Sequence, residues 1–284
     1  MRHSDPIVVV ASAFLLGLIV LVLAACSASR APAASPAFMI VATDEGFEAP
    51  TQVPAGLRHI VFTNHGTEIH EAMLVKLPAG MDAPAFVAAV KGGSLFPEGA
   101  LDYSGPGLTS PGETTEQWLR LDPGNYIVIC WNGNHASTRR PQPLVVVAEG
   151  AHDDLTPPAD VVLRLKDFRF ELSASLRRGS QVLKIENDGP SMHEADIYRL
   201  LDGKTVEDLL QWRRQDGAGT PPAIALGGVL DSHDIHREIW IRRTFAPGRY
   251  VLQCEMPMSE EAKAGSNYAS HTDAGMVLSF EIAK

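Results

Sequence analysis

The side chains of this chain best suited to chemistry are a cysteine, two histidines and a methionine, three of which lie close to its C-terminal end. They are His193, Cys254, His271 and Met276. A turn at Pro247-Gly248 starts an alternating pattern typical of a strand that ends at the cysteine, and the next strand pattern begins only after the methionine. One thiolate, two imidazoles and one thioether form the ligand set of a trigonal copper site with a weak axial sulfur. The spacing predicts one ligand from a distant strand and three from a single loop between C-terminal strands.

The segment that holds these residues has a counterpart earlier in the chain. His70-Glu71-Ala72 matches His193-Glu194-Ala195 at an offset of 123 positions, and Pro123-Gly124 with Cys130 matches Pro247-Gly248 with Cys254 at an offset of 124. So many matches at nearly one offset indicate a tandem duplication. Each copy holds about 110 to 125 residues, which is enough for a two-sheet sandwich. We therefore predict domains over residues 37–149 and 161–284, joined by a polar linker at 150–160.

Both copies consist of short runs of β-branched residues separated by Pro and Gly turns, which predicts an all-β chain with short helices in the long connections. The predicted strands are Phe38–Ala42, Arg58–Thr63, Ala72–Leu77, Gln117–Leu121, Tyr126–Cys130, Leu144–Ala148 and Ala195–Leu200. A short helix is predicted over Ala83–Val90. The expected architecture is two β-sandwiches in tandem.

The N-terminal segment has the pattern of a targeting sequence. Residues 1–26 contain an early arginine, an apolar run from Ile7 to Leu23, and small residues directly before Cys26. This arrangement resembles a bacterial lipobox, in which the cysteine is lipidated and becomes the mature N-terminus. Residues 27–36, rich in Ala, Ser and Pro, read as a flexible tether. A plain membrane anchor with a chance cysteine is the alternative, and both interpretations place the protein outside the cytoplasm on a membrane.

The net charge limits the class of partner, and the cysteine content limits the possible disulfides. A formal net charge of −10 argues against nucleic acid as a partner. With Cys26 assigned to lipid, Cys130 and Cys254 remain, and they occupy the same place in two separate sandwiches. A disulfide between them would require the two strand ends to meet with Cα atoms within about 7 Å. The duplication therefore predicts two free cysteines.

The second copy resembles the cupredoxins, the plastocyanin-like blue copper proteins. The motifs that carry this resemblance are an Asn-x-Gly turn leading to a histidine, Pro-Gly-x-Tyr-x-x-x-Cys, and His-x-x-x-x-Met before the last strand. The resemblance covers both copies and implies Greek-key β-sandwiches. It also implies copper, with His193, Cys254 and His271 as equatorial ligands and Met276 as the axial ligand. The loop from Cys254 to His271 is longer than in the simplest members, and its Met256 and Met258 are alternative soft ligands.

The first copy carries a second candidate metal site at His70, Cys130 and His135. No methionine follows, and the paired arginines at 139 and 140 bring positive charge near the expected cation. Gln142 is an alternative axial ligand through its side-chain oxygen. A degenerate sandwich, kept for stability or docking, is the favoured interpretation of this copy.

The neighbours of the two cysteines favour a carrier over an enzyme. Multicopper oxidases place histidines on both sides of the cysteine, and copper nitrite reductases place one just before it. Here the neighbours are Ile129 and Trp131 in the first copy and Gln253 and Glu255 in the second. The leading hypothesis is a membrane-tethered periplasmic or cell-surface protein for one-electron transfer, whose acidic charge suits a basic partner such as a small cytochrome. The alternatives are a copper chaperone or storage protein that meets a copper-accepting partner, and a metal-free envelope binding or scaffold module.

Overall fold

The computed structural model describes Met1 and residues 36–94, 96–215, 217–258 and 269–284. The described residues from 36 onward belong to one compact unit. Cys26 and the predicted signal and tether lie outside the described residues, apart from Met1 and residue 36. Within these ranges, no helix combines the length and the apolar character needed to cross a membrane.

Strands make up most of the unit, and we refer to residues 36–149 as the first half and 161–284 as the second half. The strands of the first half are β1 (Phe38–Thr43), β2 (Gly46–Glu48), β3 (Gln52–Pro54), β4 (Gly56–Asn64), β5 (Met73–Lys76), β6 (Leu101–Asp102), β7 (Thr114–Leu121), β8 (Gly124–Ile129) and β9 (Gln142–Val147). Those of the second half are β10 (Val161–Lys166), β11 (Arg169–Leu172), β12 (Gly179–Asn187), β13 (Ala195–Leu200), β14 (Ala223–Val229), β15 (Ile239–Phe245), β16 (Gly248–Gln253) and β17 (Val277–Ile282). The helices are α1 (Ala83–Lys91), α2 (His135–Thr138) and α3 (Val206–Arg214).

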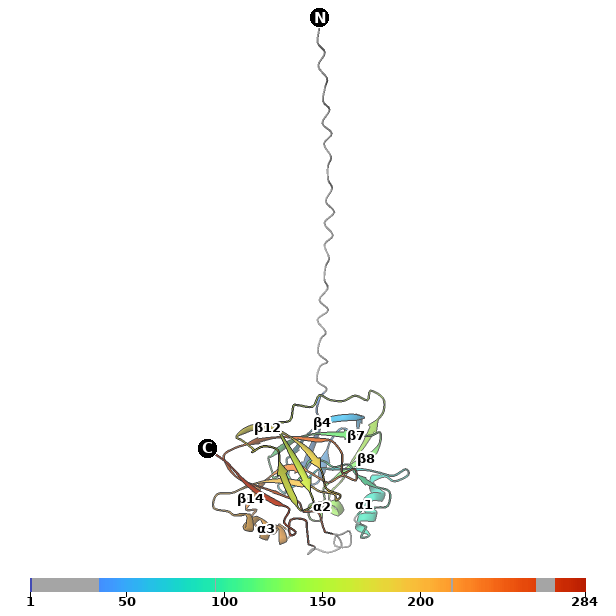
Figure 1. Cartoon of the computed structure of the whole chain (residues 1–284). Helices are drawn as coiled ribbons and strands as arrows, with labels where there is room; N and C mark the ends of the chain where they lie inside the picture. Colours follow the sequence, from blue (N-terminus) through green and yellow to red (C-terminus); the bar gives the residue numbers. More distant parts are fainter. Residues whose placement is uncertain (2–35, 95, 216, 259–268) are drawn as a thin grey trace. The chain divides into compact units, whose positions relative to one another are not determined.

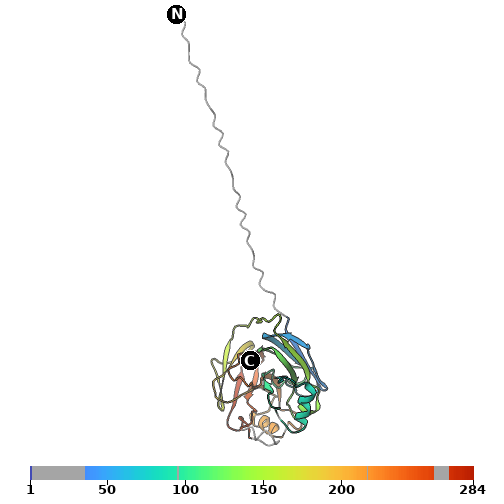
Figure 2. The same cartoon turned by 90° about the vertical axis from the view of Figure 1, so that its right-hand side faces the viewer.

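These strands form one large sheet and two smaller ones. The large sheet has eight strands in the order β11-β10-β12-β15-β7-β4-β1-β2, so that both halves contribute to it. A five-stranded sheet, β3-β9-β8-β5-β6, belongs to the first half, and a four-stranded sheet, β14-β13-β16-β17, belongs to the second. Figure 1 shows α1, α2 and α3 on the side of the unit away from β4 and β12, and Figure 2 turns this arrangement by 90°. The all-β prediction is therefore confirmed.

The two halves join through the antiparallel pairing of β7 with β15. Trp118 stands opposite Trp240, and Glu116 stands opposite Arg242. The Arg242 guanidinium lies 2.7 Å from the Glu116 carboxylate and 4.9 Å from the centre of the Trp118 ring. β7 directly precedes the turn at Gly124, and β15 directly precedes the matching turn at Gly248. The two strands that pair are therefore equivalent strands of the two halves. Backbone hydrogen bonds thus make the two halves one structural unit.

The predicted elements match the structure closely, and their local causes are visible. The helix predicted over Ala83–Val90 extends to Lys91, and the Asp82 side chain caps it by accepting a hydrogen bond from the Ala85 amide. The strand predicted over Ala195–Leu200 has these same limits. Both Cys130 and Cys254 are free and buried, as the duplication predicted. The sequence reasoning did not anticipate the short strands β2 and β3, or α3 with its capping box at Thr205.

Candidate metal centre

The Asn-x-Gly turn of the second half holds the first histidine in place. The Asn187 side-chain oxygen accepts from the Gly189 amide at 2.9 Å, and its amide donates to the Ser191 carbonyl at 2.8 Å. The turn passes close to a pair formed by Asp167 and His193. A Cβ atom on Gly189 would lie 2.6 Å from Asp167 Oδ1 and 3.2 Å from His193 Nε2. Glycine at this position therefore leaves room for the carboxylate–imidazole pair.

Replacing Gly189 by alanine should destabilise the metal-free protein by about 1–3 kcal/mol, because the added methyl group overpacks the contact between Asp167 and His193. Urea unfolding followed by circular dichroism measures the change. Gly92→Ala is the control, since its nearest neighbour would lie at 3.3 Å and its backbone has an ordinary φ of −78°. Equal unfolding midpoints for Gly189→Ala and the unmodified protein would contradict this account of the turn.

Three of the four predicted side chains of the second half converge on one point. The Nδ1 atoms of His193 and His271 lie 3.0 Å apart, and Cys254 Sγ lies 3.5 Å from His271 Nδ1 and 4.0 Å from His193 Nδ1. All three residues are buried, with exposed fractions of 5% or less. A metal ion bound about 2.0 Å from nitrogen and about 2.3 Å from sulfur fits among donor atoms at these separations. The site is therefore assembled by the fold itself.

The protonation of the two histidines suits metal binding. Asp167 Oδ1 lies 2.9 Å from His193 Nε2, and an ionised carboxylate only accepts, so the ring carries its proton on Nε2 and directs the Nδ1 lone pair into the site. Burial lowers the pKa of both His193 and His271, and the neighbouring His193 lowers that of His271 further. Although burial opposes it, hydrogen bonds from His193 and Ser191 hold the pKa of Asp167 below its usual value. Near neutral pH the two rings are thus uncharged, which is the form that can bind a metal ion.

Glu194, to which the sequence assigned no role, holds the sulfur of Cys254 in place. The Glu194 amide donates to Cys254 Sγ at 3.4 Å, while its side-chain carboxyl accepts from the Glu255 amide at 2.7 Å. Burial raises the pKa of Cys254, and the charge of Glu194 raises it further. The metal-free cysteine is therefore a thiol, and a metal ion that binds it must displace a proton.

The fourth predicted residue, Met276, has its main chain beside the other ligands. Its amide donates to the His271 carbonyl at 2.9 Å, and its carbonyl accepts from the Cys254 amide at 3.3 Å. Met276 is completely buried, Met256 is buried at the rim of a cavity, and Met258 is 44% exposed. The Met256 carbonyl also accepts from the His271 amide, at 2.8 Å, so Met276 and Met256 both lie buried beside the predicted ligand residues, whereas Met258 is exposed.

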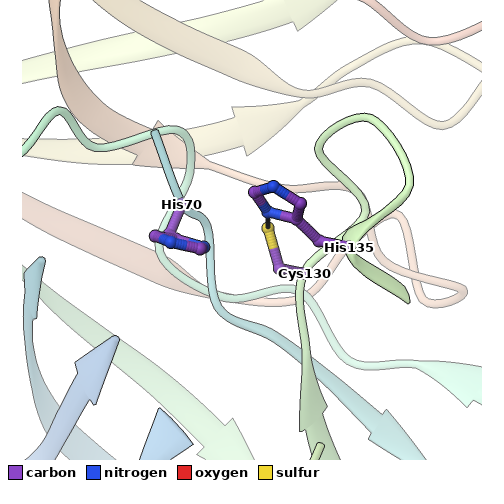
Figure 3. Close-up of side chains that lie close together, drawn as sticks. All are labelled: His70, Cys130 and His135. Atoms are coloured by element: carbon purple, nitrogen blue, oxygen red, sulfur yellow. Dashed lines mark hydrogen bonds between the residues drawn. The ribbon is translucent and has the colours of Figure 1, made fainter. Parts of the chain in front are cut away.

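The first half repeats the arrangement (Figure 3). Cys130 Sγ lies 3.4 Å from His135 Nδ1, and the rings of His70 and His135 are 4.7 Å apart between centroids. One donor atom from each of the three residues lies within 4.8 Å of the others. Asp44 takes the place that Asp167 has in the second half, because its Oδ1 atom lies 3.4 Å from His70 Nε2. Glu71 repeats the role of Glu194, because its amide faces Cys130 Sγ at 3.5 Å and its carboxyl accepts from the amide after the cysteine at 2.7 Å.

The first half differs in the surroundings of its ligands. Glu68 Oε2 lies 3.0 Å from His135 Nε2 and also pairs with Arg139. The sheet register places Arg140 where the second half has Met276. In the first half Gly124 pairs with Val146, which is six residues after Arg140. In the second half Gly248 pairs with Ile282, which is six residues after Met276. Gln142 donates its side-chain amide to the Pro143 carbonyl. The first half therefore has a Cys-His-His group without a thioether at the equivalent position.

Comparisons with known proteins give distant structural similarity. No known family model and no curated protein sequence matches this chain. Auracyanin A, described as a blue copper protein from Chloroflexus aurantiacus, is 22% identical, with 39% of this chain and 98% of that chain covered at a TM-score of 0.30. A multicopper oxidase is 14% identical over 87% of this chain and 88% of its own, with a TM-score of 0.26. A copper-containing nitrite reductase from Thermus scotoductus is 13% identical over 86% and 61%, with a TM-score of 0.24.

Proposed function

We propose that the chain is a cupredoxin-type copper protein that transfers single electrons through a site in its second half. His193, Cys254 and His271 hold the ion, and Met276 supplies a weak axial ligand. The observation that carries this proposal is the convergence of two imidazole Nδ1 atoms and one sulfur in a buried site, with separations of 3.0 to 4.0 Å. Copper bound there would supply one-electron chemistry, because nitrogen and soft sulfur ligands accept both of its common oxidation states.

The chain's own residues support a carrier. The carboxylate of Asp167 orients the His193 ring, and Glu194 holds the cysteine loop through its amide and its carboxyl. Side chains that the surrounding protein holds in place have little to rearrange when the ion changes charge. Neither cysteine has a histidine next to it in the sequence, so the ligands that lead to a second copper centre in multicopper oxidases and nitrite reductases are missing from both positions.

The first half supplies a second copper site in this proposal. His70, Cys130 and His135 are buried and converge in the same way, with Asp44 and Glu71 in the supporting places. A metal ion here would have no methionine ligand. A different absorption spectrum from that of the second half is expected, because the axial ligand tunes such a site.

The place of action is outside the cytoplasm, with the chain tethered to a membrane by lipid at Cys26. The support for this part is the pattern of residues 1–26, which resembles a bacterial lipoprotein signal. The partner in this proposal is a basic redox protein such as a small cytochrome, because a net charge of −10 attracts positively charged surfaces.

Absorption spectroscopy of the purified protein with Cu(II) tests the proposal. An intense thiolate-to-copper band is expected. Cys254→Ala should remove the contribution of the second half, Cys130→Ala that of the first half, and the double variant should have no such band. Colourless binding that is the same in the wild type and the double variant would refute the proposal. Circular dichroism of each variant verifies that the fold is retained.

A further inference from the structure

Phe168 has a backbone conformation that is unusual for a bulky side chain. It lies in the two-residue turn between β10 and β11, where Lys166 pairs with Arg169. Its φ of 64° falls in the left-handed region, which glycine and asparagine enter readily and other residues only at a cost. Among the non-glycine residues that the structure describes, Ser104 is the only other one with a positive φ. Strain of this kind persists only where surrounding contacts enforce it.

The ring of Phe168 packs against a predicted metal ligand. Its centroid lies 5.3 Å from that of the His271 ring, and the two planes are inclined by 81°, which is the edge-to-face geometry that aromatic rings prefer. Phe168 is half-buried and packs against the hydrophobic core. A Cβ atom on Gly275 would lie 4.0 Å from the Phe168 carbonyl oxygen. The turn between β10 and β11 therefore contacts the ligand loop at His271 and again close to the end of that loop.

Within the described ranges, the Nε2 atom of His271 has no hydrogen-bond partner. The polar contacts of this ring are to His193 and Cys254, and both are made by Nδ1. His193 differs, because Asp167 Oδ1 lies 2.9 Å from its Nε2 atom. Histidines that bind a metal are usually oriented through the nitrogen that does not bind it. In the absence of such a bond, the ring of Phe168 is the contact that restricts rotation of His271 on this side.

The first half orients its equivalent histidine with a carboxylate. Glu68 Oε2 lies 3.0 Å from His135 Nε2. At the offset of 123 positions between the copies, Glu68 matches Ser191, which has no carboxylate. At the same offset Phe168 matches Glu45, which is exposed and does not have a positive φ. The second histidine of each centre thus has one support, a carboxylate in the first half and an aromatic ring in the second.

We propose that Phe168 is a positioning residue, which holds the ring of His271 in the orientation that directs Nδ1 toward Cys254. This inference rests on the metal site proposed for the second half. The strained turn places the aromatic ring against His271, and the contact does for His271 what the Glu68 carboxylate does for His135. The cost of the left-handed backbone is thereby tied to the geometry of the site rather than to the stability of the turn.

Three substitutions of Phe168 in the Cys130→Ala background separate the effect of the ring from that of the backbone. Phe168→Tyr keeps an aromatic ring. Phe168→Ala and Phe168→Asn both remove it, but asparagine accepts a positive φ and alanine does not. Chelator competition should give an unchanged copper affinity in Phe168→Tyr and one about 2- to 10-fold weaker in the other two variants, the range expected for an aromatic pair. The unfolding free energy of the metal-free protein should be higher in Phe168→Asn than in Phe168→Ala.

The first half provides a matched control at the same position of the repeat. Glu45→Ala in the Cys254→Ala background should leave the copper affinity of the first centre unchanged, because the exposed Glu45 side chain supports neither histidine there. An equal loss of affinity in Glu45→Ala would show that any change in this turn disturbs the neighbouring centre, and would overturn the assignment to the ring.

Nuclear magnetic resonance of the metal-free protein supplies a measurement that does not depend on copper. The nuclear Overhauser effect between the His271 ring and the β-protons of Cys254 should persist in Phe168→Tyr and weaken in Phe168→Ala and Phe168→Asn. The Nε2 proton of His193 should keep its hydrogen bond to Asp167 in all three variants.

Three results would overturn the proposal. The first is an unchanged Overhauser effect in both variants that lack the ring. The second is a loss of copper affinity that follows the unfolding free energy, so that Phe168→Asn binds more tightly than Phe168→Ala. The third is loss of the His193 signal, which would place the effect at Asp167. If the parent protein does not bind copper, the proposed function fails, whereas the Overhauser effect still decides the role of Phe168.

Discussion

Replacing Asp167 by asparagine should weaken copper binding at the second half's centre by about 10- to 100-fold. The carboxylate lies 2.9 Å from His193 Nε2 and, being ionised, requires a proton on that atom. An asparagine side chain has a similar shape but no charge, and it can donate as well as accept. The ring of His193 is then free to carry its proton on Nδ1, the atom that faces Cys254 and His271.

Competition with a chelator of known affinity measures this effect. The experiment uses the Cys130→Ala background, so that only the second half's centre contributes. Asp44→Asn in the Cys254→Ala background is the matched measurement on the first half. Its effect should be smaller, because Asp44 lies 3.4 Å from His70 Nε2 and its pKa, near 2, is set first by its hydrogen bond from the Thr67 hydroxyl. An unchanged copper affinity in Asp167→Asn would show that the carboxylate does not orient the ring.

Asp196 should contribute stability to the metal-free protein that is lost as the pH rises from about 4 to about 8, and Asp196→Asn should remove this contribution. Burial, and next the charge of Glu71, raise the pKa of Asp196 from 3.8 to about 8, against the opposing charge of Arg213. The folded state therefore holds a proton that the unfolded state releases above pH 3.8. The stabilisation is complete below that pH and decreases by up to about 1.4 kcal/mol per pH unit until the folded group also ionises.

Urea unfolding at pH 5 and pH 8 measures this dependence. On going from pH 5 to pH 8, the unfolding free energy of the unmodified protein should decrease relative to that of Asp196→Asn. Asp160→Asn is the control, because a hydrogen bond from the Val182 amide lowers the pKa of Asp160 and confines its influence to pH values below 3.8. A steeper decline in Asp196→Asn than in the unmodified protein would contradict the assignment of the buried proton.

Sequence spacing was sufficient to predict which side chains come together, because two of the three lie at strand ends. Cys254 follows β16 directly, and His193 stands two residues before β13. The supporting carboxylates were harder to assign. Asp167 lies 26 positions before His193, in the turn between β10 and β11, and only the parallel pairing of β10 with β12 brings them together. The match of Asp44 with Asp167 between the two copies was a signal in the sequence, although the spacing did not indicate what these residues contact.

The joining of the two halves into one eight-stranded sheet could not be predicted from the sequence either. The predicted strand Gln117–Leu121 lies within β7, but no strand was predicted over Ile239–Phe245, and a strand pattern does not show which edges pair with each other. The cavity that Met256 borders depends on that pairing, since its walls come from both halves. The absence of a thioether in the first half was visible in the sequence, whereas the occupation of that position by Arg140 required the register of β8 with β9.

The antiparallel pairing of β7 with β15 is the contact that two identical subunits would make about a two-fold axis, here carried within a single polypeptide. A homodimer of half-length chains would depend on concentration for its assembly, and every substitution would occur twice. Fusion of the subunits makes their association intramolecular, so the pair stays together at any dilution. Fusion also lets each copy change independently, so that the second half can have Met276 where the first half has Arg140.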